Sequence, residues 1–318
     1  MKLRISKPLV KDFDPEKYIL DEGLQQAVEV AIALDQPLLL TGEPGTGKTR
    51  LAYKVAYELH KDQSSYHFGA NPLAFYTKTT SSAKDLFYLY DALAHFQSAN
   101  LRREVGEAAP KSAQFIELHA LGKAIALSNP ENVDTSRFRT SLGTSPQSSV
   151  VLIDEIDKAP RDFPNDILNE IENLEFQIKE QDNYTIRAGK SERIVTILTS
   201  NSEKNLPEPF LRRCIFYHIP FPSEAQLLAI AKAQLGSDTR LADELLSEII
   251  QYFNEIRKRS VRKKPATAEL ISWLRILELE EIYTAADLRK NRQRLSDNLS
   301  VLIKTKEDLD AVRELFAS

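Results

Sequence analysis

The feature that most constrains this chain is a glycine-rich octapeptide between an apolar run and a helical pattern. Residues 37–41 are typical of a short buried strand, and residues 48–60 carry apolar side chains at helical spacing. The octapeptide matches G-x-x-x-x-G-K-[ST] and consists of Gly42, Glu43, Pro44, Gly45, Thr46, Gly47, Lys48 and Thr49. Its glycines let backbone N–H groups approach phosphate oxygens, at the positive end of the following helix. The motif predicts a phosphate-binding loop in which Lys48 contacts phosphate and the Thr49 hydroxyl contacts Mg²⁺.

A second apolar strand ends in two carboxylates. Residues 150–153 are continuously apolar, as in a strand buried on both faces, and Asp154 and Glu155 follow directly. Open α/β sheets bind ligands at the carboxyl ends of their strands. We expect Asp154 to hold Mg²⁺ and Glu155 to act as general base toward an attacking water. An Asp-Glu pair at a strand end also serves as a helix cap, and its combination with the loop favours the catalytic interpretation.

Further candidate site residues follow. Asn201 comes after the apolar residues 194–198, where its amide either orients the water or makes an ordinary turn. Arg212 and Arg213 precede the next apolar strand; such a pair is solvated, or reaches the γ-phosphate on a neighbouring subunit as an arginine finger. The basic run 257–264 has three interpretations: a solvated helix end, a contribution to the phosphate site, or a nucleic-acid contact.

The alternation of apolar strands and helical patterns predicts an α/β fold for residues 1–221, with a parallel sheet flanked by helices. Polar segments within about 98–149 predict inserted, exposed loops, and residues 175–194 predict a hairpin. Residues 222–318 carry successive helical stripes, so we expect a small all-α C-terminal lid domain. Besides 48–60, helices are expected over 21–35, 83–97, 162–174, 224–235, 241–258, 268–282, 297–304 and 307–316.

Composition narrows the class of protein. The chain has 318 residues, 42% of them hydrophobic, which is sufficient for a full core. No apolar run approaches the ~18 residues of a membrane span, and the N-terminus lacks the apolar region of a signal peptide, so we expect a cytoplasmic protein. The single cysteine, Cys214, excludes an internal disulfide. A net charge of −4 argues against general nucleic-acid binding.

These motifs occur in the order found in AAA+ ATPases, and from about residue 18 to 279 the chain resembles the MoxR family. Residues 42–49 and 152–160 are similar to its Walker A and Walker B motifs. Asn201 is similar to its sensor 1, and Arg213 to its arginine finger. The resemblance implies a P-loop AAA+ core with a helical lid, bound ATP and Mg²⁺, and a ring that is typically a hexamer. It further implies a remodelling or assembly factor for a protein client, often with a von Willebrand factor A domain partner.

Two departures from the family pattern are present. Lys48 and Asp154 are 154 − 48 = 106 positions apart, which is longer than expected, and the extra length falls in the polar segments. Lys264-Pro265-Ala266-Thr267 stands where the family has a Pro-Arg pair, so Arg262 is the candidate for the sensor 2 arginine of the lid.

Two alternatives remain open at this stage. One is a nucleic-acid-directed AAA+ motor or a restriction-associated NTPase, although the Asn-Thr-x-Asp signature of the restriction branch is absent because residues 199–202 read Thr-Ser-Asn-Ser. The other is a scaffold that binds ATP and barely hydrolyses it. The presence of both Asp154 and Glu155 counts against the scaffold.

Overall fold

The chain divides into two compact units in the computed structural model, which describes residues 13–62, 66–202 and 206–313. The core unit comprises residues 20–42 and 48–219. The helical unit comprises residues 13–19, 43–47 and the chain from Pro220 onward. The division at Pro220 lies next to the boundary expected near residue 221. The assignment of two domains, 1–221 and 222–318, stays a prediction.

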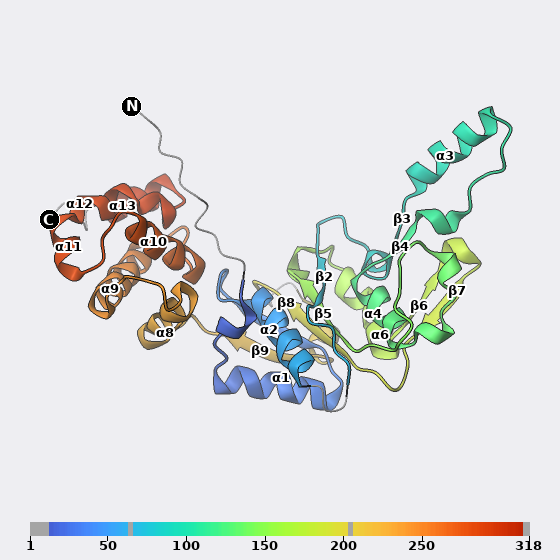
Figure 1. Cartoon of the computed structure of the whole chain (residues 1–318), viewed down its shortest axis with the longest axis horizontal. Coiled ribbons are helices and arrows are strands. Elements are labelled where there is room, and N and C mark those ends of the chain that lie inside the picture. Colours follow the sequence, from blue (N-terminus) through green and yellow to red (C-terminus); the bar gives the residue numbers. More distant parts are fainter. Residues whose placement is uncertain (1–12, 63–65, 203–205, 314–318) are drawn as a thin grey trace. The chain divides into compact units, whose positions relative to one another are not determined.

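A five-stranded parallel sheet organises the core unit (Figure 1). Its strands lie in the order β2 (Leu73–Tyr76), β5 (Ser149–Asp154), β8 (Ile194–Thr199), β1 (Leu38–Gly42) and β9 (Ile215–Ile219). Every residue of the three inner strands is buried, which explains why their sequences are continuously apolar rather than alternating. In register, Leu40 lies beside Thr199, and Ile153 lies beside Leu198. The carboxyl ends of β1, β5 and β8 therefore meet at one edge.

Helices flank this sheet, as the α/β fold class requires. The helices are α1 (Glu22–Leu34), α2 (Lys48–Lys61), α4 (Ala120–Ser128), α5 (Phe163–Asp166), α6 (Leu168–Asn173) and α7 (Glu208–Leu211). α1 packs on β1 and β9, whereas α2 and α4 pack on β5. Asp21 begins α1 by accepting a hydrogen bond from the Leu24 N–H at 2.9 Å. The single helix expected over 162–174 is wrong in detail, because the chain is interrupted between α5 and α6 at Ile167.

The helix expected over 83–97 is not present as predicted. Residues 88–118 instead form an inserted two-stranded ribbon with a helix, called the arm below. The structure has a short 3-10 turn at Ala83–Leu86, then β3 (Tyr88–Tyr90), and only then α3 (Ala92–Glu104). The prediction of one helix is wrong because β3 pairs antiparallel with β4 (Ile116–Leu118), and Asp91 caps a new helix through the Ala94 N–H. Figure 1 shows α3 projecting from this two-stranded ribbon, away from the sheet. The polar stretch 98–149 is thus partly helical and includes β4 and α4.

The expected hairpin is confirmed between β6 (Glu175–Ile178) and β7 (Tyr184–Arg187). Asp182 and Asn183 in its turn have φ angles of 55° and 56°, a conformation that these two residue types tolerate well. The hairpin packs on the base of the arm, where the Tyr88 hydroxyl donates to Glu180 Oε2 at 2.8 Å. The Phe176 ring stacks on the Phe87 ring, and the two ring centroids are 5.2 Å apart.

The helical unit has its own apolar core, which includes the fully buried Phe253 and Trp273. Its helices are α8 (Glu224–Leu235), α9 (Asp243–Arg259), α10 (Thr267–Leu279), α11 (Ala285–Lys290), α12 (Arg292–Asp297) and α13 (Lys306–Arg313). The helices predicted over 224–235, 241–258 and 268–282 are confirmed within a few residues. The helix predicted over 297–304 is wrong, since that segment holds a 3-10 turn at Leu299–Val301. Residues 314–316 of the last predicted helix lie outside the described residues.

None of the helices in the described part of the chain combines the length and apolar character of a membrane span.

Candidate nucleotide site

The predicted phosphate-binding loop connects β1 to α2, as the sequence pattern requires. Lys48 is the first residue of α2, and its Nζ donates to the backbone oxygen of Gly42 at 2.8 Å. Burial lowers the pKa of Lys48, against the opposing effect of the carboxylates of Asp157, Asp154 and Glu155. The ammonium group is thus held at the end of the buried sheet with carboxylates near it. Such a cation is suited to a polyanionic ligand.

The middle of the loop has backbone angles that favour glycine. Gly45 has φ +76° and Gly47 has φ +95°, in the region that residues with a Cβ rarely adopt. Thr46 Oγ1 donates to the backbone oxygen of Glu43 at 2.9 Å and closes the loop on itself. Pro44 lies between these residues. Residues 43–47 group with the helical unit, in which the Glu43 carboxylate is paired with Arg257.

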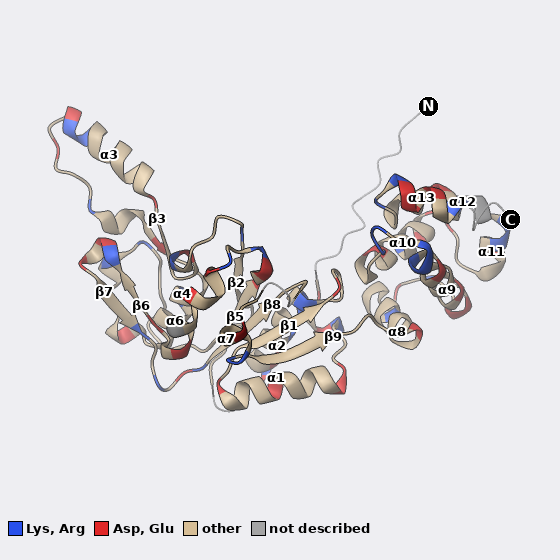
Figure 2. Cartoon of the chain, turned by 180° about the vertical axis from the view of Figure 1, so that it is seen from behind, with Lys and Arg blue, Asp and Glu red and all other residues tan. Residues whose placement is uncertain are grey.

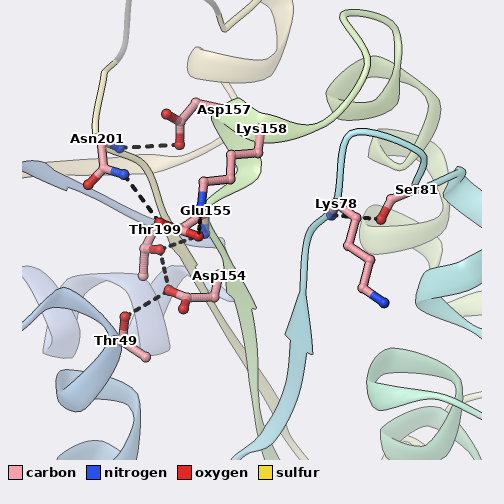
Figure 3. Close-up of polar contacts among 9 residues, drawn as sticks. All are labelled: Thr49, Lys78, Ser81, Asp154, Glu155, Asp157, Lys158, Thr199 and Asn201. Carbon is pink, nitrogen blue, oxygen red and sulfur yellow. Dashed lines mark hydrogen bonds and ion pairs between the residues drawn. The ribbon is translucent and has the colours of Figure 1, made fainter. Parts of the chain in front are cut away.

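Asp154 lies at the centre of a hydrogen-bonded cluster at the carboxyl ends of β5 and β8 (Figure 3). Its Oδ1 accepts from Thr49 Oγ1 at 2.8 Å and from Thr199 Oγ1 at 2.6 Å. The Thr199 hydroxyl also accepts from the Glu155 N–H at 2.9 Å, so it links the two carboxylate residues. Asp154 and Thr49, the two predicted Mg²⁺ ligands, are therefore in direct contact. Their oxygen donors fit a hard cation such as Mg²⁺.

Glu155 follows the strand in a left-handed conformation, with φ 57°. Its carboxylate forms an ion pair with Lys158 and lies 3.5 Å from Asn201 Nδ2 (Figure 3). The Asn201 backbone N–H donates to Asp157 Oδ1 at 3.2 Å. Sequence reasoning expected the side chains of Glu155 and Asn201 to act on one water, and the structure brings them together.

The predicted arginines lie at the surface in ion pairs. Arg213 Nε is 2.5 Å from Glu172 Oε1, and both side chains are about half exposed. Arg212 pairs with Glu208 within the same turn. Arg262 Nε is 2.6 Å from Glu307 Oε2. The roles of Arg212, Arg213 and Arg262 toward nucleotide stay predictions.

A family comparison decides the class of protein to which this site belongs. The model of the family described as ATPase family associated with various cellular activities (AAA) matches residues 38–223, more than half of the chain. The chain belongs to the AAA family. The match includes the loop, the Asp154 cluster and Asn201, so the site described above lies within the ATPase domain of this AAA protein.

Other comparisons add little to the family assignment. No curated protein matches this AAA protein by sequence. Among solved structures, domain III of the replication initiation protein DnaA from Thermotoga maritima is 12% identical, with a TM-score of 0.43, 98% of this chain covered and 100% of that chain. A RuvB mutant from Thermotoga maritima is 17% identical, with a TM-score of 0.46, 90% of this chain covered and 70% of that chain. Scores of this size carry no argument about fold or function.

Sequence reasoning missed three residues of the AAA site. Thr199 bridges the Asp154 carboxylate and the backbone N–H of Glu155, and Lys158 pairs with the Glu155 carboxylate. Arg257 pairs with Glu43 of the loop. A threonine at the carboxyl end of a strand was a usable signal for Thr199, because that edge was already predicted to carry the site. The basic run around Arg257 gave no indication that one of its members is buried.

Proposed function

We propose that this protein is an ATP-hydrolysing remodelling or assembly factor of the MoxR type, which acts as a ring on a protein client. The observation that carries the hydrolase part is the Asp154 cluster, in which Thr49, Thr199 and Asp154 share hydrogen bonds beside Glu155 and Asn201. The AAA family match and the glycine-rich loop support ATP as the nucleotide.

Each site residue has a distinct role in this proposal. Thr49 and Asp154 hold Mg²⁺, and Lys48 with the loop N–H groups binds the phosphates. When bound, Mg·ATP supplies a γ-phosphoryl group for transfer to water. Glu155 accepts the proton of that water, and the Asn201 amide orients it.

The first test separates binding from hydrolysis. Lys48→Ala removes the buried cation and is expected to abolish Mg·ATP binding, measured by equilibrium titration. Glu155→Gln keeps the shape of the site and loses the base, so it is expected to bind Mg·ATP and to release phosphate at least about 100-fold more slowly. Phosphate release at the wild-type rate by Glu155→Gln contradicts its role as base.

We also propose that the site is completed by a neighbouring subunit through Arg213. The Arg213–Glu172 pair is half exposed, and a pair of this kind contributes only about 0–1 kcal/mol, so it is easily exchanged for a phosphate contact. Specific activity is then expected to rise with protein concentration. Mixing Arg213→Ala subunits with Lys48→Ala subunits is expected to restore activity, because some interfaces combine an intact loop with an intact arginine. Arg212→Ala is the control with a milder effect.

A protein client is supported by the arm. No side chain of α3 is buried, and Leu93, Phe96 and Leu101 are 67%, 65% and 65% exposed. Figure 2 shows α3 as mostly uncharged, with charged residues gathered at its far end. Exposed apolar side chains suit a protein surface, whereas nucleic acid requires several cationic contacts to phosphate.

The client is tested with the ATP-locked Glu155→Gln form. We expect a pull-down analysed by mass spectrometry to capture a protein, with a von Willebrand factor A domain as the expected partner, and Leu93→Ser/Phe96→Ser to reduce this capture. Capture is compared with a DNA titration at physiological salt. DNA binding below about 1 μM that stimulates ATP turnover, with no protein captured, favours the nucleic-acid-directed alternative instead.

A further inference from the structure

Arg257 differs from the other cationic residues of the basic run 257–264 because it is buried. It lies in the last turn of α9 and is 8% exposed. Its guanidinium carbon lies 3.4 Å from the centroid of the Phe221 ring, and its Nη1 donates to the backbone oxygen of Pro265. Its Nη2 donates to Glu43 Oε2 at 2.7 Å. The guanidinium is therefore held by contacts with Phe221, Pro265 and Glu43, and Glu43 belongs to the phosphate-binding loop.

The loop packs closely against other residues of the helical unit. A Cβ added to Gly45 would lie 2.5 Å from the Cβ of Ala266, which leaves no room for a side chain. A Cβ added to Gly47 would lie 3.1 Å from the ring of Tyr18. Ala266 follows Pro265 directly, so the segment that accepts the hydrogen bond from Arg257 also contacts the loop. Residues 43–47 of the loop are therefore packed against Tyr18 and Ala266 of the same unit.

Glu43 presents an electrostatic difficulty for a loop that binds phosphates. It is the one carboxylate within residues 42–49, and an unpaired carboxylate would repel the anion that the loop N–H groups attract. The buried guanidinium of Arg257 compensates the charge of Glu43. Its planar set of N–H donors also fixes the position of the Glu43 carboxylate. Removing Arg257 would leave the Glu43 carboxylate, whose side chain is 46% exposed, without this compensating charge beside the loop.

We propose that Arg257 is a positioning residue for nucleotide binding: it neutralises Glu43 and fixes residues 43–47 of the phosphate-binding loop within the helical unit. The inference rests on the proposed ATP site and assigns to Arg257 a contact with the loop, whereas the family resemblance made Arg262 the candidate sensor 2 arginine. Arg257 acts through Glu43, so the effect of removing Arg257 depends on whether residue 43 is charged.

A double-mutant cycle tests this dependence by equilibrium binding of a fluorescent methylanthraniloyl derivative of ATP with Mg²⁺. The proteins are wild type, Arg257→Gln, Glu43→Gln and the double variant. Arg257→Gln is expected to weaken binding about tenfold when Glu43 is present, and less than about threefold in the Glu43→Gln background. Equal losses in the two backgrounds overturn the proposal, because Arg257 would then act only by supporting the fold.

Controls separate this outcome from misfolding. Lys258→Gln changes the next residue, an exposed cation paired with Glu255, and is expected to leave affinity unchanged. The fluorescence of the buried Trp273 reports the fold of the helical unit. If Arg257→Gln does not fold, Arg257→Lys replaces it in the cycle. Lysine keeps the positive charge but lacks the planar guanidinium group. Arg257→Lys is therefore expected to weaken nucleotide binding about threefold, and only when Glu43 is present.

The proposed function and this inference fail in different ways. Absence of probe binding by wild type, equal to the baseline of Lys48→Ala, refutes the nucleotide site itself. Wild-type binding combined with losses that do not depend on Glu43 refutes only the role of Arg257.

Discussion

The contacts of Asp308 allow its contribution to the stability of the helical unit to be predicted. Its side chain, 2% exposed, lies in α13 and accepts four hydrogen bonds. Oδ1 accepts from the backbone N–H groups of Val261 at 2.8 Å and Arg262 at 3.0 Å. Oδ2 accepts from the Lys263 N–H at 3.0 Å and from Thr305 Oγ1 at 2.8 Å. Asp308 thus holds the segment that leads from α9 to Pro265.

These contacts set both the pKa of Asp308 and its contribution to stability. Burial by itself raises the pKa of the carboxyl, but the hydrogen bonds outweigh it and lower the pKa from 3.8 to about 2. The lowered pKa of Asp308 corresponds to about 2–3 kcal/mol of folding free energy. Because the folded pKa is depressed, this stability is present in full above about pH 4. It is lost as the pH falls through about 2.

The perturbation is Asp308→Asn, which removes the charge and turns an NH₂ group toward N–H donors. At pH 7 we expect the free energy of unfolding of the helical unit to fall by about 2–3 kcal/mol. The assay is urea unfolding followed by the fluorescence of Trp273, the one tryptophan of the chain, which is fully buried in α10. The matched control is Asp310→Asn, whose carboxylate lies 4.0 Å from Arg313 at the surface and contributes less than about 1 kcal/mol.

The pH dependence of unfolding shows whether the charge of Asp308 causes the difference in stability between wild type and Asp308→Asn. The difference between wild type and Asp308→Asn is expected to shrink as the pH is lowered from about 4 to about 2. A difference at pH 7 that is no larger than that of Asp310→Asn, or one that does not change with pH, refutes the reasoning.

Three further predictions concern the site and the arm. Thr199→Val is expected to slow phosphate release about tenfold while nucleotide titration shows little change, because the partly buried backbone N–H of Glu155 loses its acceptor. Lys158→Gln is expected to raise phosphate release about two- to fivefold, since the ion pair no longer restrains Glu155; a slower rate would contradict this. Gly122→Ala places a Cβ 2.0 Å from a backbone oxygen and is expected to cost at least about 3 kcal/mol in thermal or urea unfolding, whereas Gly143→Ala meets nothing within 4 Å.

The core strands were predictable because burial on both faces leaves a continuous apolar sequence. Residues 150–153 and 194–198 had this character, and the apolar strand predicted after Arg213 is β9. The edge strand β2 was missed, since its residues are only partly buried and its four positions give no clear period. The stretch 83–97 was misread because its apolar residues, the buried Leu86 and the exposed Leu93 among them, recur at helical spacing although a pairing strand intervenes.

The site was predictable where a local motif dictates the chemistry. Gly42 to Thr49 and Asp154-Glu155 are read from consecutive residues, and parallel pairing then brings them to one edge. Thr199 and Arg257 act through contacts between segments far apart in sequence, 199 with 154 and 257 with 43. Nothing in the local sequence distinguishes a buried arginine from its solvated neighbours, because tertiary packing alone decides which member of a basic run is enclosed.

The arm has a mechanical consequence. At 1.5 Å per residue, the 13 residues of α3 form a rod about 20 Å long. Its root is fastened to the β6–β7 hairpin by Tyr88, Lys84 and Ser112, all of which contact Glu180. A tilt of only about 10° at that root carries the free end of the rod by about 3–4 Å. A small tilt at the root, where the arm contacts the hairpin, is therefore amplified into a larger displacement at the tip.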